Sequence, residues 1–190
     1  MADTALYSHY ADPIRIGRYT NKFTVFTETE RPYTRLIFSD EFYSARRWLT
    51  EEFKSLGLHC HIDSGCSLIG RRPAGPHFTA SQTVIIGSHI DTVPSGGRFD
   101  GVAGVITTME IIHYLNERSI ELPFTLEVAD FLGEEFNVWS TSCLGSRHMA
   151  GLLDGEMLVR SDDRGRILGH EVAAGGGHGR SPIWCTLRRI

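Results

Sequence analysis

The chain has 190 residues, of which 41% are hydrophobic and 22% are charged, and it carries a formal net charge of −4. These values are ordinary for a globular protein with one core of domain size. The negative charge provides no broad positive field for nucleic acid or anionic lipid, and no apolar run approaches the ~20 residues of a membrane span. We therefore expect neither a nucleic-acid partner nor a membrane partner.

The amino-terminal residues and the cysteines indicate the cellular compartment. Residues 1–18 mix charged and polar side chains where a secretory signal needs an uninterrupted apolar stretch. The four cysteines form no CxxC pair, so reduced thiols are expected rather than disulfides. They are Cys60, Cys66, Cys143 and Cys185. Both features favour a cytoplasmic location.

The first clear element is an amphipathic helix that begins after Ser39. Serine is a favourable N-cap, and apolar residues then recur at helical spacing until Gly57 ends the pattern. Loose alternation at residues 58–63 and a short apolar piece at residues 68–69 predict two modest strands. A loop rich in proline and glycine follows them.

A strand, a loop, a helix and another strand come next. The β-branched run at residues 83–86 predicts a buried strand, residues 102–115 show helical periodicity, and residues 124–132 predict a neighbouring strand. This is the order of a βαβ unit, in which a helix covers two parallel strands. The expected fold class is α/β, with a mixed sheet flanked by helices.

Polar side chains follow the first of these two strands. His89 and Asp91 come directly after it, and ligand-binding residues collect at the carboxyl ends of strands in α/β sheets. Imidazole and carboxylate both bind divalent metals, and a ligating imidazole usually needs a carboxylate on its other nitrogen. Gly96 and Gly97 let the loop turn back and bring Asp100 to the same point. The pattern predicts a metal site.

Two adjacent carboxylates, Glu134 and Glu135, follow the second strand and therefore open on the same edge of the sheet. Adjacent carboxylates repel one another unless cations compensate them or they face different ways. We therefore expect one of them to bind a metal and the other to act as a free base. Either motif alone is more often an ordinary polar loop, whereas the two together favour a functional site.

Simpler explanations exist for several polar residues. Asp100 is also a candidate cap for the helix that follows it. The histidines and cysteines in residues 59–66 match no usual structural zinc spacing, so packing is the favoured explanation for them. The arginine pair at residues 46–47 fits a solvent-facing stretch.

Three stretches carry a family resemblance. Residues 38–58, 87–105 and 127–151 closely resemble the amino-terminal part of the zinc-dependent amidohydrolases that include N-carbamoyl-L-amino-acid hydrolase, allantoate amidohydrolase and β-ureidopropionase. These enzymes are relatives of the aminoacylase and carboxypeptidase G-type dinuclear metallopeptidases. The resemblance runs from about Ile14 to about Glu171 and implies a hydrolase that cleaves non-peptide carbon–nitrogen bonds.

The resemblance implies two divalent metal ions, zinc first, with manganese, cobalt or nickel as alternatives. It implies that His89 binds one ion, that Asp100 bridges both, and that Glu135 binds the second. It further implies that Asp91 orients the histidine and that Glu134 is the general base. The implied substrate is a small linear amide, an N-carbamoyl amino acid or a ureido compound.

The chain departs from the family pattern in two respects. Cys66 and Ser67 stand where many relatives have Gly-Asn. The relatives are longer chains, with a further metal-binding histidine, a lid and dimerisation domain, and a last histidine near the carboxyl terminus. We therefore expect a truncated, incomplete catalytic domain that is inactive alone. A homodimer is expected only for the full-length relatives.

Three segments are expected along the chain. They are an amino-terminal extension with the first elements at residues 1–35, a partial catalytic metal-binding domain at 36–171, and a divergent, poorly ordered tail at 172–190. Two other functions stay open: an aminoacylase- or dipeptidase-like metallohydrolase, and a non-catalytic metal-binding remnant. Metal content and turnover would separate the remnant from both enzymes.

Overall fold

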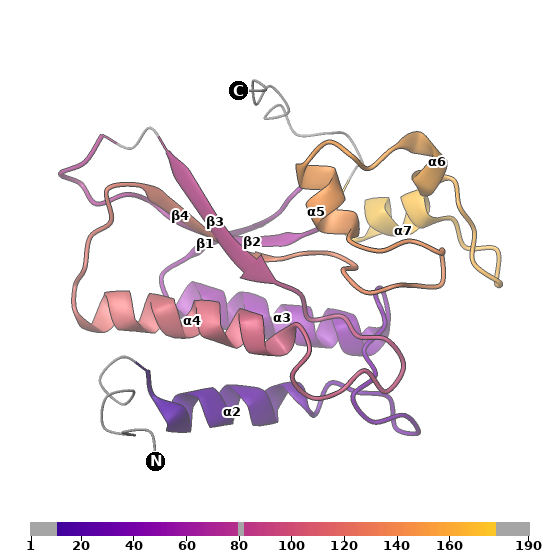
Figure 1. Ribbon diagram of the computed structural model, residues 1–190, viewed down its shortest axis with the longest axis horizontal. Coiled ribbons are helices and arrows are strands. Elements are labelled where there is room, and N and C mark those ends of the chain that lie inside the picture. The colour runs from indigo at the N-terminus through magenta and orange to yellow at the C-terminus, as the bar shows by residue number, and fades with distance from the viewer. Residues whose placement is uncertain (1–10, 80–81, 178–190) are drawn as a thin grey trace, which may run out of the picture.

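The computed structural model describes residues 11–79 and 82–177. At its centre is a four-stranded mixed sheet in the order β1-β2-β4-β3 (Figure 1). β1 pairs antiparallel with β2, β2 pairs antiparallel with β4, and β3 runs parallel to β4. The expected α/β class with a mixed sheet is therefore confirmed. The strands are β1 (His59–Ile62), β2 (Leu68–Arg72), β3 (Thr83–Ser88) and β4 (Thr125–Asp130).

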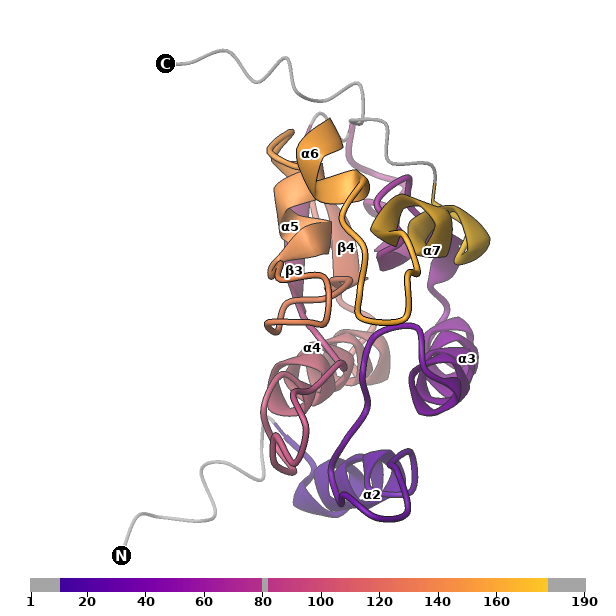
Figure 2. The ribbon, with the colours of Figure 1, turned by 90° about the vertical axis from the view of Figure 1, so that its right-hand side faces the viewer.

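Long helices form two layers beside the sheet. α3 contacts β1 and β2, α4 contacts β3 and β4, and α2 contacts α4 as a further layer. The shorter helices gather on the side of the molecule away from α2 (Figures 1 and 2). No helix in the described ranges is long and apolar enough to cross a membrane. The helices are α2 (Pro13–Phe23), α3 (Asp40–Ser55), α4 (Val102–Glu117), α5 (Leu144–Met149), α6 (Gly155–Leu158) and α7 (Leu168–Ala174).

Helix α3 forms where the sequence predicts it. Ser39 is the N-cap, and its hydroxyl accepts the N–H of Phe42 at 3.2 Å. Gly57 follows the helix with a φ of +81°, which glycine adopts without steric cost. The apolar stripe faces the core, and its members Phe42, Ala45, Leu49 and Phe53 are fully buried.

Helix α2 lies in the expected amino-terminal extension and has no counterpart among the predicted elements. Its local signals are Asp12, whose side chain accepts the N–H groups of Ile14 and Arg15, and Pro13 at the first helical position. The mean hydropathy of the helix is polar, but the helix has one narrow apolar face, on which Phe23 is 2% exposed. Residues 1–10 of the extension lie outside the described ranges.

Strand β3 differs from the prediction of a buried strand. It lies at the edge of the sheet, and Val84 and Ile85 keep 39% and 37% of their surface exposed. The buried strand is β4, in which all six residues are buried between β2 and β3. A continuous apolar run indicates a strand but does not indicate whether it has one neighbour or two, which explains the error.

The expected start of the divergent tail falls inside helix α7. Val172 is 1% exposed and belongs to the core, and the thiol of Cys66 donates to the carbonyl of Gly175 at 3.2 Å. Within this stretch Val172 and Gly177 are buried, whereas Ala173, Ala174 and Gly176 are exposed, so the described part of the segment is only partly packed. Residues 178–190, the remainder of that segment, lie outside the described ranges.

Candidate functional site

The side chains predicted at the two strand ends converge around one imidazole ring. His89 directly follows β3, and its Nε2 lies 3.4 Å from a carboxylate oxygen of Glu134 and 3.8 Å from one of Asp100. This is possible because β3 and β4 are parallel and neighbouring, so that their carboxyl ends open on the same edge. A histidine and two carboxylates from separate parts of the chain thus meet at one point.

Asp91 ties the two strand ends together. Its carboxylate oxygens accept the main-chain N–H groups of Glu134 at 3.3 Å and Glu135 at 3.2 Å. Nδ1 of His89 lies 3.6 Å from this carboxylate and 3.0 Å from the carbonyl oxygen of Asp91. Because a carbonyl oxygen only accepts hydrogen bonds, Nδ1 carries the proton and Nε2 faces the other carboxylates. Asp91 therefore sets the orientation of the ring and, when the ring is neutral, its tautomer.

Gly101 gives the histidine its space. A Cβ atom at this position would lie 2.4 Å from the carbonyl oxygen of His89, and the glycine has a φ of +64°. Gly101 is also the N-cap of α4, which has no side-chain cap hydrogen bond. The alternative role of Asp100 as a helix cap is therefore not observed. Its carboxylate, 60% exposed, faces the imidazole instead.

The electrostatics of the site are those of a negative cluster. Burial lowers the pKa of His89, but the hydrogen bond and charge of Asp91, with the charge of Glu134, outweigh burial and raise it to about 9. Burial raises the pKa of Glu135, and the negative charges of Asp100, Glu134 and Asp91 raise it further, against the effect of the histidine. Such a cluster favours the binding of a cation.

The donor types fit a divalent metal, and the described residues supply part of a ligand set. Two atoms ~2.1 Å from a tetrahedral zinc ion lie about 3.4 Å apart. The 3.8 Å between His89 Nε2 and Asp100 Oδ1 thus fits two ligands of one ion after a small movement. Within residues 11–79 and 82–177, however, no group of three or more histidine, cysteine, aspartate or glutamate side chains is arranged to hold a metal.

A pocket of about 220 Å³ adjoins the site. Asp91 and Glu135 form part of its wall, and Phe136 and Val138 supply apolar surface that is 66% and 51% exposed as whole residues. The pocket therefore combines apolar walls with the polar groups of the strand ends, which is the usual composition of a small-molecule site.

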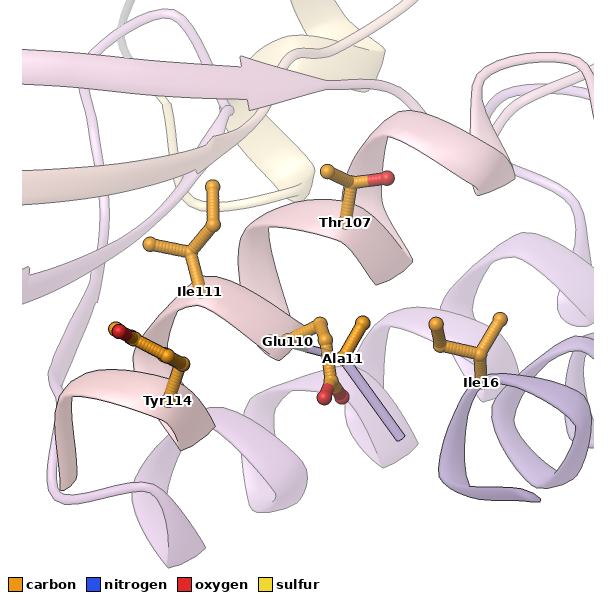
Figure 3. Close-up of a pocket in the computed structure, with 6 residues that line it drawn as sticks. All are labelled: Ala11, Ile16, Thr107, Glu110, Ile111 and Tyr114. Atoms are coloured by element: carbon orange, nitrogen blue, oxygen red, sulfur yellow. The ribbon is translucent and has the colours of Figure 1, made fainter. Parts of the chain in front are cut away.

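A larger pocket of about 420 Å³ lies between α2 and α4 (Figure 3). Its lining is mostly apolar, and its one carboxylate, Glu110, is already paired with Arg15 at 2.6 Å. None of the five predicted site residues lines it. Two of the five, Asp91 and Glu135, line the smaller pocket instead.

Two buried charged residues behind the site, Arg46 and Asp130, are not among the predicted site residues. Arg46, expected to face solvent, is 6% exposed, and its Nε donates to a carboxylate oxygen of Asp130 at 2.9 Å. A signal for this was present, because Arg46 lies on the same helical face as Phe42, Leu49 and Phe53. An arginine within a buried stripe implies a buried acid, which Asp130 supplies at the end of β4.

The fold and site together define an α/β protein with a histidine–carboxylate cluster at the carboxyl ends of two parallel strands. Residues 67–162, about half of the chain, match the family model of peptidase family M28. The chain belongs to this family.

Similar proteins are found in plants and bacteria. Ureidoglycolate hydrolase of Oryza sativa subsp. japonica is 34% identical over 153 residues, which are 80% of this chain and 31% of that protein. N-carbamoyl-L-amino-acid amidohydrolase of Pseudomonas sp. (strain NS671) is 36% identical over 129 residues, which are 68% of this chain and 31% of that protein. The chain thus spans 31% of the length of both curated relatives.

A solved structure extends the match to the fold. The hydantoinase/carbamoylase family amidase from Burkholderia ambifaria superposes with a TM-score of 0.81 at 32% identity, over 91% of this chain and 43% of that one. The resemblance predicted from the three sequence stretches is therefore confirmed.

Proposed function

We propose that this chain carries the strand-end part of a metal-dependent hydrolase site that cleaves a non-peptide carbon–nitrogen bond in an N-carbamoyl or ureido substrate. The observation that carries the proposal is the convergence of Glu134 and Asp100 on Nε2 of His89, at 3.4 Å and 3.8 Å. The names of the relatives, a ureidoglycolate hydrolase and an N-carbamoyl-L-amino-acid amidohydrolase, support the substrate class.

Glu134 is the proposed general base. Its carboxylate is 45% exposed, so that it can reach a water molecule and a substrate, while its main-chain N–H is fixed by Asp91. It would accept a proton from the attacking water and pass that proton to the leaving nitrogen. The main-chain N–H of the neighbouring Glu135 is held by the other oxygen of Asp91, and its carboxylate is given the different role of a metal ligand.

His89, Asp100 and Glu135 are the proposed holders of two divalent ions, zinc by preference and manganese, cobalt or nickel as alternatives. Bound ions of this kind polarise a carbonyl group and make water a better nucleophile at neutral pH. The 3.8 Å separation of the first two donors and the negative charge of the cluster support this assignment. Asp91 is the proposed orienting residue for the histidine.

A second function has one finding in its favour. The matching family model is described as a peptidase family, which keeps an aminoacylase- or dipeptidase-like hydrolase as an alternative. The metal cluster is the same in both proposals, and the two differ only in whether the scissile bond belongs to a carbamoyl group or to an acyl or peptide group.

The test compares hydrolysis of N-carbamoyl-L-amino acids, ureidoglycolate and dipeptides by two proteins. One is the 190-residue chain, and the other is residues 1–171 fused to the remaining part of the Pseudomonas relative. We expect the chain alone to show no turnover, because its described residues supply an incomplete ligand set. The fusion should hydrolyse a carbamoyl or ureido compound, with loss of activity when the metal is chelated.

Variants of the fusion test the roles. Glu134→Gln should lower kcat by about 10²- to 10⁴-fold with the metal content unchanged, since an amide cannot accept the proton. Glu135→Gln should lose one metal ion. Preference for dipeptides would favour the alternative function. Full activity of Glu134→Gln would contradict the base assignment, and metal binding without any turnover would support the non-catalytic remnant.

A further inference from the structure

The main chain between His89 and Asp91 is held by side chains rather than by the sheet. The ladder of β3 reaches its end at Ser88, whose carbonyl accepts the N–H of Phe131 at 2.8 Å. Ile90, two residues further along the chain, is fully buried, and its N–H donates to a carboxylate oxygen of Asp130 at 3.1 Å. Its carbonyl accepts Nε of Arg35 at 2.6 Å. Both polar groups of one buried residue are thus bonded to charged side chains.

Arg35 is fixed from several directions. Its Nη1 donates to the carbonyl groups of Phe23 at 3.3 Å and Phe26 at 2.8 Å, at the end of α2. Its main chain pairs with Thr92 in both directions, because Arg35 N–H donates to the threonine hydroxyl at 2.8 Å and Thr92 N–H donates to the carbonyl of Arg35 at 3.0 Å. The guanidinium is therefore anchored near the end of α2 and bonds the main chain between His89 and Asp91.

Asp130 is fixed in the same manner from the opposite side. Its side chain is fully buried, and Arg46 of helix α3 bonds it at 2.9 Å. A second guanidinium nitrogen of Arg46 donates to the carbonyl of Cys66 at 2.6 Å. The acid that bonds the Ile90 N–H is thus tied to a helix and a loop that do not contain any of the five candidate site residues.

Burying charged side chains against neutral peptide groups costs solvation free energy, so this arrangement needs a reason. In an extended segment, residues i and i+2 point to the same side while the residue between them points to the other. Ile90 points into the core, and His89 and Asp91 point to the site. Fixing the peptide groups of the middle residue therefore fixes the direction of both neighbours.

We propose that Arg35 and Asp130 are positioning residues that clamp Ile90 and thereby hold His89 and Asp91 in the orientation of the candidate site. The importance of that orientation rests on the proposed function, whereas the clamp itself does not. The effect passes onward through Asp91, whose carboxylate bonds the N–H groups of Glu134 and Glu135. Displacement of the clamp should therefore be detectable at those two amides.

The test is nuclear magnetic resonance on the metal-free chain, without any measurement of turnover. Arg35→Met removes the bond to Ile90 and keeps an unbranched apolar side chain. In the folded variant, the amides of Glu134 and Glu135 should lose about tenfold of their hydrogen-exchange protection, because their bonds to Asp91 weaken. The ring signals of His89 should shift, and Arg35→Lys should recover part of both effects.

Arg15→Met is the matched control. Arg15 is also a partly buried arginine in hydrogen bonds, with its side chain 14% exposed, but its partners are the buried Glu110 and the exposed Glu117, both on α4. It should lower the melting temperature and leave the two site amides unchanged.

Unchanged amide and histidine signals in folded Arg35→Met would overturn the proposal. Failure of both Arg35 variants to fold would also count against it, because Arg35 would then serve folding in general. An inactive fusion protein would contradict the proposed function and leave this result standing.

Discussion

The carboxylate of Asp91 accepts the main-chain N–H of Glu134 at 3.3 Å, across 43 positions of sequence. One end of this bond belongs to the segment that carries His89, and the other belongs to the proposed base. The position of the base relative to the imidazole is therefore set by a buried acid, 1% exposed, rather than by contact between the two groups alone. This relationship makes Asp91 a stability determinant as well as an orienting residue.

Asp91→Asn should lower the free energy of unfolding by about 1–3 kcal/mol, because an amide retains one acceptor oxygen where the carboxylate has two. Thermal unfolding measures this. Asp154→Asn is the control, since Asp154 caps the short helix α6 at the surface and asparagine caps equally well. Equal stability of the wild type and Asp91→Asn would show that the paired N–H bonds contribute nothing.

Gly101→Ala should destabilise the protein by several kcal/mol and displace His89. The position has a φ of +64°, and the added Cβ would lie 2.4 Å from a main-chain oxygen that cannot move freely. Gly17→Ala is the control, because Gly17 lies in helix α2 with no atom within 4 Å of an added Cβ. That variant should gain about 1 kcal/mol from helix propensity. Chemical denaturation should therefore show a lower free energy of unfolding for Gly101→Ala and a higher one for Gly17→Ala.

Arg46 and Arg47 are neighbours in sequence that should behave very differently. Arg46→Met leaves the buried carboxylate of Asp130 without its partner and should cost about 3–5 kcal/mol. Arg47 is exposed and bonds the hydroxyl of Ser44, so Arg47→Met should change stability by less than about 0.5 kcal/mol. Similar urea midpoints for the two variants would contradict the buried pair.

The Arg15–Glu110 pair predicts a pH dependence. Burial raises the pKa of Glu110, but the hydrogen bonds from Arg15 and from the main chain of Asp12, with the arginine charge, outweigh burial and lower it below its ordinary value of 4.5. A lowered folded pKa gives stability that is present above the ordinary value and lost as the pH falls through the folded one. The melting temperature of Glu110→Gln should therefore lie below that of the wild type at pH 7 and approach it under acid conditions. A constant difference from pH 7 to pH 3 would contradict this account.

Several elements could be predicted from local chemistry. Helix α3 is predictable because Ser39 and Gly57 mark its ends and its apolar residues repeat at helical spacing. The parallel pairing of β3 and β4 follows from the βαβ order, and it is this pairing that allows the convergence of His89 and Glu134 to be expected. Both are consequences of patterns within short segments.

Features that depend on distant neighbours could not be predicted in this way. The edge position of β3 depends on the strand order, and the identity of the acid that pairs with Arg46 depends on tertiary structure, because Asp130 lies 84 positions away in sequence. Arg35 gives no local signal, because its acceptors are main-chain carbonyl groups that any residue supplies. The packing of Val172 similarly depends on tertiary contacts that composition does not reveal.

The central claim is that the histidine at the end of β3 binds a divalent metal together with its neighbouring carboxylates. Titration of the 190-residue chain with zinc or cobalt, monitored by calorimetry, tests this claim. The wild type is compared with His89→Ala and with the control His61→Ala, which alters an exposed histidine on β1 at the far edge of the sheet. We predict that His89→Ala weakens metal binding at least about tenfold and that His61→Ala leaves it unchanged. Equal affinity in the wild type and His89→Ala would contradict the claim.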